Sequence, residues 1–179
     1  MGTMAFNTRT ESFEDYPLIE PSTAAPEVDG RTRHYLLPGE LKVSADPAQM
    51  TTILGSCVSV CMWDPNASIG GMNHFLLPAW REGEGHSTRF GDIATRTLLE
   101  KLIAMGCQRR HLVAKLFGGS ALFQKESRYF ASLGAKNVEA ARLMMKNAGV
   151  PVIAQDTGGN KGRKLIFNTD DGSAWSRQV

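Results

Sequence analysis

The sequence has few cysteines, little net charge and no long apolar segment. Its three cysteines lack regular spacing, which does not fit the disulfide framework of a secreted protein. The formal net charge is only +2, and its Lys and Arg are spread along the chain, unlike the clustered basic face of nucleic-acid readers. No apolar run approaches the ~20 residues that cross a bilayer, and the first ten residues lack the apolar core of a signal peptide. We therefore expect a cytoplasmic protein with free thiols, without membrane insertion or nucleic-acid binding.

The chain is long enough for one domain with its own core, since 42% of its 179 residues are apolar. Residues 1–33 are rich in Pro, Ser, Thr and acidic residues and have no helical or alternating pattern, which predicts a mobile N-terminal tail. The remaining residues, 34–179, are expected to form a single domain.

Strand and helix patterns are mixed in this domain. Apolar and β-branched segments predict strands within 34–44, 51–63, 69–78, 111–119, 150–156 and 163–168. Helical periodicity predicts one helix over 92–106 and a second that begins at Asn137 as its N-cap and ends at Gly149. Because the strands do not alternate strictly with helices, we expect an α/β fold of the α+β type, with helices packed on a mixed sheet.

One apolar stretch, "ILGSCVSVCMWDPNASIGGMNHFLLP" (residues 53–78), holds the residues with the clearest chemistry. The turn "DPNAS" predicts an antiparallel hairpin, which would bring His74 near Cys57. Cysteine needs such a partner, because the thiolate is the nucleophile and an imidazolium lowers the thiol pKa from ~8.5. Either Thr51 or Thr52 could orient the imidazole, and the sequence does not choose between them. Buried packing residues are the alternative interpretation of this pair.

A metal site is not predicted, because Cys57 and Cys61 have neither the spacing of a thiolate knuckle nor nearby histidines in a ligand pattern. Cys61 is expected in the core, and no cofactor is expected. Backbone groups beside the Gly55 break and at two glycine turns, "FGGSA" and "DTGGNKGRK", can hold an oxyanion or let a substrate come close. These candidates are Ser56, Val58, Gly118, Gly119, Gly158 and Gly159.

These motifs, "GSCV…GGMNH", "FGGSALF" and "DTGGNKGR" in this order, closely resemble the CheD family of chemoreceptor glutamine deamidases. The resemblance implies a mixed β-sandwich packed with helices, similar to toxin deamidases that use a Cys-His pair. It implies that Cys57 is the nucleophile and His74 the base. The family's orienting threonine lies six residues before the nucleophile, which selects Thr51 over Thr52.

The resemblance also implies the reaction and the partners. Cys57 would attack the side-chain amide of a receptor glutamine, and hydrolysis of the resulting thioester would give glutamate. The substrates would be the cytoplasmic helices of chemoreceptors, and some family members also bind a CheC-type phosphatase. Two alternatives stay open: a regulatory module that docks on this phosphatase or on receptors, and a thiol hydrolase acting on another amide or ester.

Overall fold

The structure is a computed structural model that describes residues 30–121 and 128–179, without the side chains of 128–131. The expected N-terminal tail lies outside the described residues except for its last four. Of these, Thr32 and Arg33 already belong to strand β1, Thr32–Tyr35. The expected boundary between tail and domain therefore falls inside a strand.

Four strands form the first sheet, in the order β1-β3-β8-β9. Besides β1 they are β3 (Ala48–Leu54), β8 (Arg163–Asn168) and β9 (Ala174–Gln178). The pair β1 and β3 is parallel, whereas β3 with β8 and β8 with β9 are antiparallel. The sheet is therefore mixed, as the sequence predicts.

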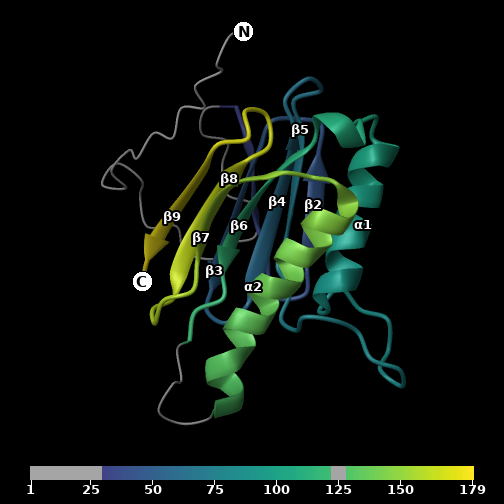
Figure 1. Cartoon of the computed structure of the whole chain (residues 1–179). Helices are drawn as coiled ribbons and strands as arrows, with labels where there is room; N and C mark the ends of the chain where they lie inside the picture. Colours follow the sequence, from purple (N-terminus) through teal and green to yellow (C-terminus); the bar gives the residue numbers. More distant parts are fainter. Residues whose placement is uncertain (1–29, 122–127) are drawn as a thin grey trace, which may run out of the picture.

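Five strands form the second sheet, in the order β2-β5-β4-β6-β7. They are β2 (Leu41–Ser44), β4 (Val58–Asp64), β5 (Ile69–Asn73), β6 (Val113–Gly118) and β7 (Val152–Thr157). Only β6 and β7 run parallel, and the antiparallel pairing of β4 with β5 confirms the predicted hairpin. Helices α1 (Gly91–Ala104) and α2 (Arg128–Ala148) lie side by side against this sheet (Figure 1). A short 3-10 turn, Arg109–His111, precedes β6.

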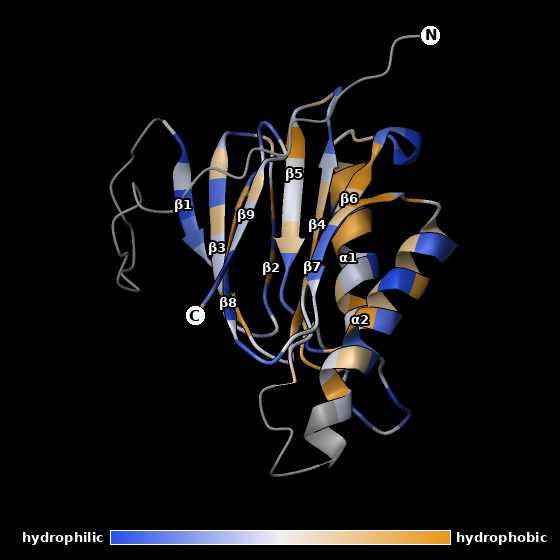
Figure 2. Cartoon of the chain, turned by 60° about the vertical axis from the view of Figure 1, so that its left-hand side comes forward, coloured by the Kyte–Doolittle hydropathy of each residue, from blue (hydrophilic) through white to orange (hydrophobic). Residues whose placement is uncertain are grey.

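The hydrophobic core has two layers, one on each face of the five-stranded sheet. Strand β4 is central, and because its side chains alternate between the two faces of the sheet, it contributes residues to both layers. Val60 and Met62 face the helices, whereas Cys61 faces the first sheet and lies in one cluster with Met50 and Leu165 of that sheet. The burial of Cys61, which is 1% exposed, confirms its predicted core position. In Figure 2, α2 carries both hydrophobic and hydrophilic segments, as expected for a helix with one buried face.

The structure differs from the predicted elements at three points. The second helix begins at Arg128 and not at Asn137, so Asn137 is an interior residue of α2 and the predicted N-cap is wrong. Strand β9 was not predicted, because its short sequence "AWSRQ" ends in polar residues and has no apolar alternation. The predicted strand over 51–63 is two strands in different sheets, separated at Gly55–Cys57.

Candidate active site

The linker Gly55–Cys57 carries the chain from one sheet to the other. Strand β3 ends at Leu54 in the first sheet, and β4 begins at Val58 in the second. Cys57 is half-buried and packs against the hydrophobic layer between the two sheets. The glycine break therefore sets the thiol at the end of this layer, where part of the residue stays accessible.

His74 follows β5 and reaches the same layer from the neighbouring strand. Val58 and Phe75 form an isolated antiparallel bridge, with N–H to carbonyl distances of 3.1 and 3.0 Å in the two directions. This register places Ser59 opposite His74 and makes Cys57 its diagonal neighbour on the same face of the sheet. The imidazole is 2% exposed, so it lies in a dry environment.

A threonine from the opposite sheet fixes the imidazole. The Thr52 hydroxyl oxygen lies 2.8 Å from His74 Nδ1 and donates its own proton to the Leu36 carbonyl at 2.7 Å. A hydroxyl has only one proton to donate, so its oxygen accepts the Nδ1–H of His74. The imidazole is then the Nδ1–H tautomer, and its Nε2 is a lone-pair acceptor. Nε2 is buried and has no hydrogen-bond partner in the described part of the chain.

The structure brings Thr52, and not the predicted Thr51, to the imidazole. Met50 and Leu54 of β3 point into the layer between the sheets, and Thr52 lies on the same face as these two residues. Side chains alternate along a strand, so Thr51 points to the other face of its sheet, away from His74. The hydroxyl that contacts the imidazole is therefore the one at position 52.

Burial sets the resting charge of both groups. It raises the pKa of the Cys57 thiol above its ordinary value, and the residue's own N–H opposes this shift. Burial also lowers the pKa of His74 to about 4, against smaller opposing effects of the Leu36 carbonyl and Glu40. At neutral pH the site therefore holds a neutral thiol and a neutral imidazole. This differs from the low thiol pKa that an imidazolium partner would produce.

Backbone N–H groups next to the Cys57 thiol are the possible oxyanion donors. The N–H of Val58, an expected oxyanion donor, donates to the Phe75 carbonyl in this structure. The N–H groups of Ser56 and Cys57 form no backbone hydrogen bond with any described residue. Ser56 therefore remains a candidate oxyanion donor, and the Cys57 N–H joins it.

The first glycine turn packs on the Cys57 linker. The Gly119 N–H donates to the Cys57 carbonyl at 2.8 Å, and the Ser120 N–H donates to the Gly55 carbonyl at 2.8 Å. Gly118 has a φ of +105°, and a Cβ at this position would overlap the Cys57 carbonyl oxygen. Gly118 is therefore needed for this close approach of two main chains, whereas a Cβ at Gly119 would instead overlap Val138 and the Gly134 carbonyl of α2. The N–H of Gly119 is occupied, so we no longer expect it to bind substrate.

The second glycine turn supports the first one. The Gly158 N–H donates to the Gly118 carbonyl at 2.9 Å, and the Gly159 carbonyl accepts the Ala121 N–H at 2.8 Å. The structure therefore brings the two turns together, but it uses Gly158 and Gly159 in contacts within the protein.

Arg163 donates hydrogen bonds to residues of both glycine turns, a role that was not predicted from the sequence. It is 2% exposed, and its guanidinium donates to Asp156 Oδ1 at 2.7 Å, to the Ser120 hydroxyl at 3.3 Å and to the Gly158 carbonyl. An arginine next to a glycine turn gives no sequence signal for such a role, because its partners include Ser120, which lies 43 residues away in the other turn.

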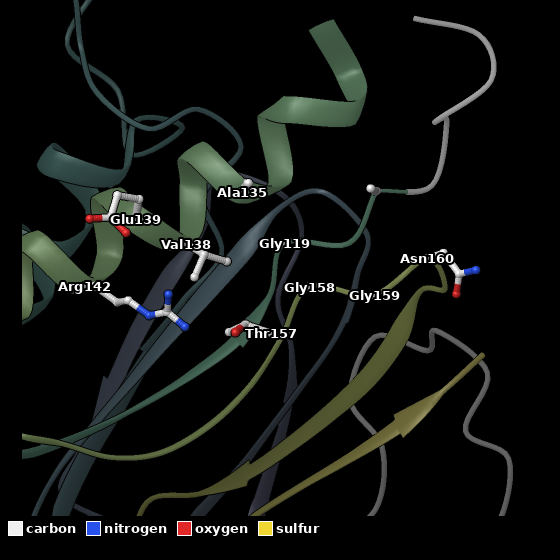
Figure 3. A pocket seen from close by; sticks show the side chains of 10 residues that line it. Gly119, Ala135, Val138, Glu139, Arg142, Thr157, Gly158, Gly159 and Asn160 are labelled. Atoms are coloured by element: carbon white, nitrogen blue, oxygen red, sulfur yellow. The ribbon is translucent and has the colours of Figure 1, made fainter. Parts of the chain in front are cut away.

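A pocket of about 700 Å³ lies on the helix side of the glycine turns (Figure 3). Gly119, Gly158 and Gly159 line it together with Val138 and Arg142 of α2. Neither Cys57 nor His74 lines this pocket. It is therefore separate from the thiol, which faces the layer between the sheets.

Residues 30–121 and 128–179 contain neither a metal-binding cluster nor a membrane-spanning helix. No group of three or more His, Cys, Asp or Glu side chains in these residues could hold a metal ion. None of the helices found there is long and apolar enough to cross a membrane.

Comparisons with known proteins agree on one family. The family model described as "CheD chemotactic sensory transduction" matches residues 76–178. The chain is 46% identical over 165 residues to a protein of Anaeromyxobacter dehalogenans named "Probable chemoreceptor glutamine deamidase CheD 1", covering 89% of this chain and 95% of that protein. A Trichlorobacter lovleyi protein with a similar name is 45% identical, covering 78% of this chain and 86% of the relative.

Solved structures are much less similar. A Neisseria meningitidis protein superposes on 70% of this chain and 63% of its own with a TM-score of 0.41 and 13% identity, which is too low to support an argument. The chain belongs to the CheD family.

Proposed function

We propose that this protein is a chemoreceptor glutamine deamidase with Cys57 as nucleophile and His74 as base. The observation that carries the proposal is the imidazole held by Thr52, with an unprotonated Nε2 on the same sheet face as Cys57. Relatives that are 45–46% identical and bear this enzyme's name support the substrate class.

The first half-reaction forms a thioester. As the glutamine side chain enters, the Cys57 proton moves to His74 Nε2, and the sulfur attacks the amide carbon. The amide oxygen becomes an oxyanion, for which the N–H groups of Ser56 and Cys57 are the available donors. The protonated Nε2 then donates its proton to the amide nitrogen, the C–N bond breaks, and ammonia leaves.

The second half-reaction consumes one water. His74 Nε2 takes a proton from the water, whose oxygen attacks the thioester carbon. The C–S bond breaks, Cys57 regains its proton from the imidazole, and the product is glutamate. The balance is one glutamine and one water to one glutamate and one ammonia.

Neutral resting groups fit this sequence of steps. The low pKa of His74 makes an imidazolium unstable in the closed site, so the proton it receives is readily passed to the leaving nitrogen. The Thr52 hydroxyl accepts a hydrogen bond from Nδ1–H, and this bond partly stabilises the imidazolium while it exists. The pair therefore acts by proton transfer during the reaction and not as a preformed ion pair.

The proposed partners are the cytoplasmic helices of chemoreceptors as substrate and a CheC-type phosphatase as regulator. We also propose the architectural relation to Cys-His toxin deamidases and a cytoplasmic location. These proposals come from the family resemblance, and the described surface does not by itself name a partner.

The test is to incubate the full chain with a receptor cytoplasmic fragment and to measure glutamine residues by mass spectrometry. Wild type is expected to add about 1 Da at specific glutamines, because –NH₂ is replaced by –OH. Cys57→Ala is expected to abolish the change while Cys61→Ala, at a core cysteine, reduces stability more than rate. Equal conversion by Cys57→Ala would refute the mechanism. A Cys57→Ala protein that keeps the full cellular phenotype would favour a docking module.

A further inference from the structure

Asn137 is a buried polar residue of α2 that touches the active-site linker from the other side of the sheet. It is 0% exposed, and its Nδ2 lies 2.9 Å from the Ser56 carbonyl and 2.8 Å from the Leu76 carbonyl. Two carbonyl oxygens are both acceptors, so the side chain must present its nitrogen to them. Each proton of this nitrogen then has its own partner.

The two partners of Asn137 belong to the two halves of the site. Ser56 immediately precedes Cys57, and Leu76 lies two residues after His74. The Val58–Phe75 bridge is the last bridge between these segments, and beyond it the Leu76 N–H donates to the Arg89 carbonyl. The Asn137 amide therefore joins the two segments where their own ladder has ended.

All three carbonyls of the linker are held by fixed donors. Gly55 is held by the Ser120 N–H, Ser56 by Asn137, and Cys57 by the Gly119 N–H. In a trans peptide group the C=O and the following N–H point in opposite directions. The donor that fixes the Ser56 carbonyl therefore also fixes the direction of the Cys57 N–H.

Because the Ser56 carbonyl points toward Asn137 of α2, the Cys57 N–H points to the opposite side of the linker, where Cys57 packs against the layer between the sheets. This N–H forms no hydrogen bond with another backbone group of the described chain. An oxyanion on a carbon bonded to the Cys57 sulfur would find this donor already in place.

The free acceptor of Asn137 argues against a purely packing role. Its Oδ1 is buried without a hydrogen-bond partner among the described residues. A buried unpaired amide oxygen costs about 1–3 kcal/mol, which an apolar residue of similar size would avoid. The residue is therefore better explained by its two donors than by its contribution to the core.

We propose that Asn137 is a positioning residue that orients the Cys57 peptide group, so that its N–H stabilises the oxyanion of the deamidation reaction. This inference rests on the proposed function, because it needs a reaction that forms an oxyanion at Cys57. Asn137 itself touches neither the substrate nor the reacting atoms.

The test compares reactions of Cys57 that do and do not form an oxyanion. Asn137→Leu has a similar volume and no donor. It is expected to lower kcat on a receptor fragment by about 10- to 100-fold with little change in KM, somewhat less than direct loss of an oxyanion donor. A peptide whose glutamine side chain ends in an aldehyde, which forms a hemithioacetal, should inhibit more weakly by the same factor. Alkylation of Cys57 by iodoacetamide forms no oxyanion. Its rate should therefore differ by about twofold at most between wild type and Asn137→Leu when both are measured over the same pH range.

Two further variants separate positioning from stability. Met145→Ala removes a side chain that is 1% exposed on the same helix and is expected to lower stability but leave kcat unchanged. Asn137→Asp keeps the shape, and its protonated form can donate only one of the two bonds. Its activity should fall as pH rises through the carboxyl pKa, a dependence that wild type lacks.

The outcomes distinguish this inference from the proposed function. No conversion by wild type would refute the proposed function itself. Active wild type with unchanged kcat in a folded Asn137→Leu protein would overturn only the inference. A fall in the alkylation rate equal to the fall in kcat would also overturn the inference. Failure of both Asn137 variants to fold would do the same, since either result means that Asn137 is a structural residue.

Discussion

Thr52→Val and Thr51→Val are a matched pair that tests which threonine orients the base. Both substitutions replace a hydroxyl by a methyl group of nearly the same size, at adjacent residues of β3. Only Thr52 contacts His74, at 2.8 Å from Nδ1, whereas the spacing of the family motif points to Thr51. We expect a large effect at position 52 and a small one at position 51.

The magnitude follows from the two hydrogen bonds that Thr52→Val removes. The Leu36 carbonyl and the Nδ1–H of His74 would both lose their partner in a buried site. Each unsatisfied buried group costs about 1–3 kcal/mol, so the free energy of unfolding should fall by about 2–6 kcal/mol. Loss of the tautomer preference of His74 should lower kcat by about 10- to 100-fold, which corresponds to roughly 1.4–2.8 kcal/mol.

Three measurements check this prediction. Urea unfolding gives the stability difference, mass spectrometry of a receptor fragment gives the rate, and ¹⁵N NMR of the imidazole gives the tautomer. In wild type and Thr51→Val we expect a protonated Nδ1, and in Thr52→Val a mixture or the Nε2–H form. If Thr51→Val lowers kcat as much as Thr52→Val does, or if Thr52→Val keeps wild-type kcat and tautomer, the role derived for Thr52 is wrong.

Further predictions concern pH, the glycine turn and the buried arginine. The pKa of His74 is 6.5 when unperturbed and about 4 in the fold, so the unfolded chain binds more protons between these values. The free energy of unfolding should thus fall by about 3 kcal/mol as pH drops from 6.5 to 4, and urea titrations of His74→Gln should lack this component. Gly118→Ala should abolish turnover because its Cβ would overlap the Cys57 carbonyl oxygen, whereas Gly83→Ala, also at positive φ but with open space around it, should keep wild-type kcat. Arg163→Met should lower both thermal stability and kcat, because it releases Asp156 and both glycine turns; a kcat equal to wild type would show that the turns hold their shape without it.

The hairpin of β4 and β5 could be predicted from the sequence, whereas the passage of the chain between two sheets at Gly55–Cys57 could not. "DPNAS" is a strong turn signal, and the apolar segments on both sides have the length of buried strands. The hairpin alone predicts that Cys57 and His74 lie close together, without any knowledge of the rest of the fold. Local patterns of this kind depend on short-range chemistry, which the sequence expresses directly.

The orienting hydroxyl and Asn137 depend on contacts that local patterns do not contain. The choice between Thr51 and Thr52 depends on which face of β3 meets the second sheet, and Gly55 interrupts the alternation that would extend from Cys57. Asn137 lies 81 residues from Ser56 and 61 from Leu76. A polar residue ahead of an apolar helical pattern is typical of an N-cap, so its position inside α2 could not be predicted.

The resting protonation states of Cys57 and His74 could not be predicted from the sequence either. A cysteine next to a histidine suggests an ion pair, and sequence reasoning gives no measure of burial. In the fold, burial raises the pKa of Cys57 and lowers that of His74, which favours the neutral forms of both. The residue types define the possible chemistry, and the three-dimensional environment decides which protonation state is present at rest.

The central claim is that Cys57 forms a thioester with the substrate glutamine. It is tested most directly by acid-quenching the enzyme during turnover of a receptor peptide and measuring the mass of its cysteine-containing fragments. The account predicts a peptide adduct on the fragment with Cys57, released by hydroxylamine as a hydroxamate, and no adduct with Cys57→Ala. Turnover by Cys57→Ala at the wild-type rate, or hydroxylamine-sensitive adducts on Cys107 alone, would contradict it.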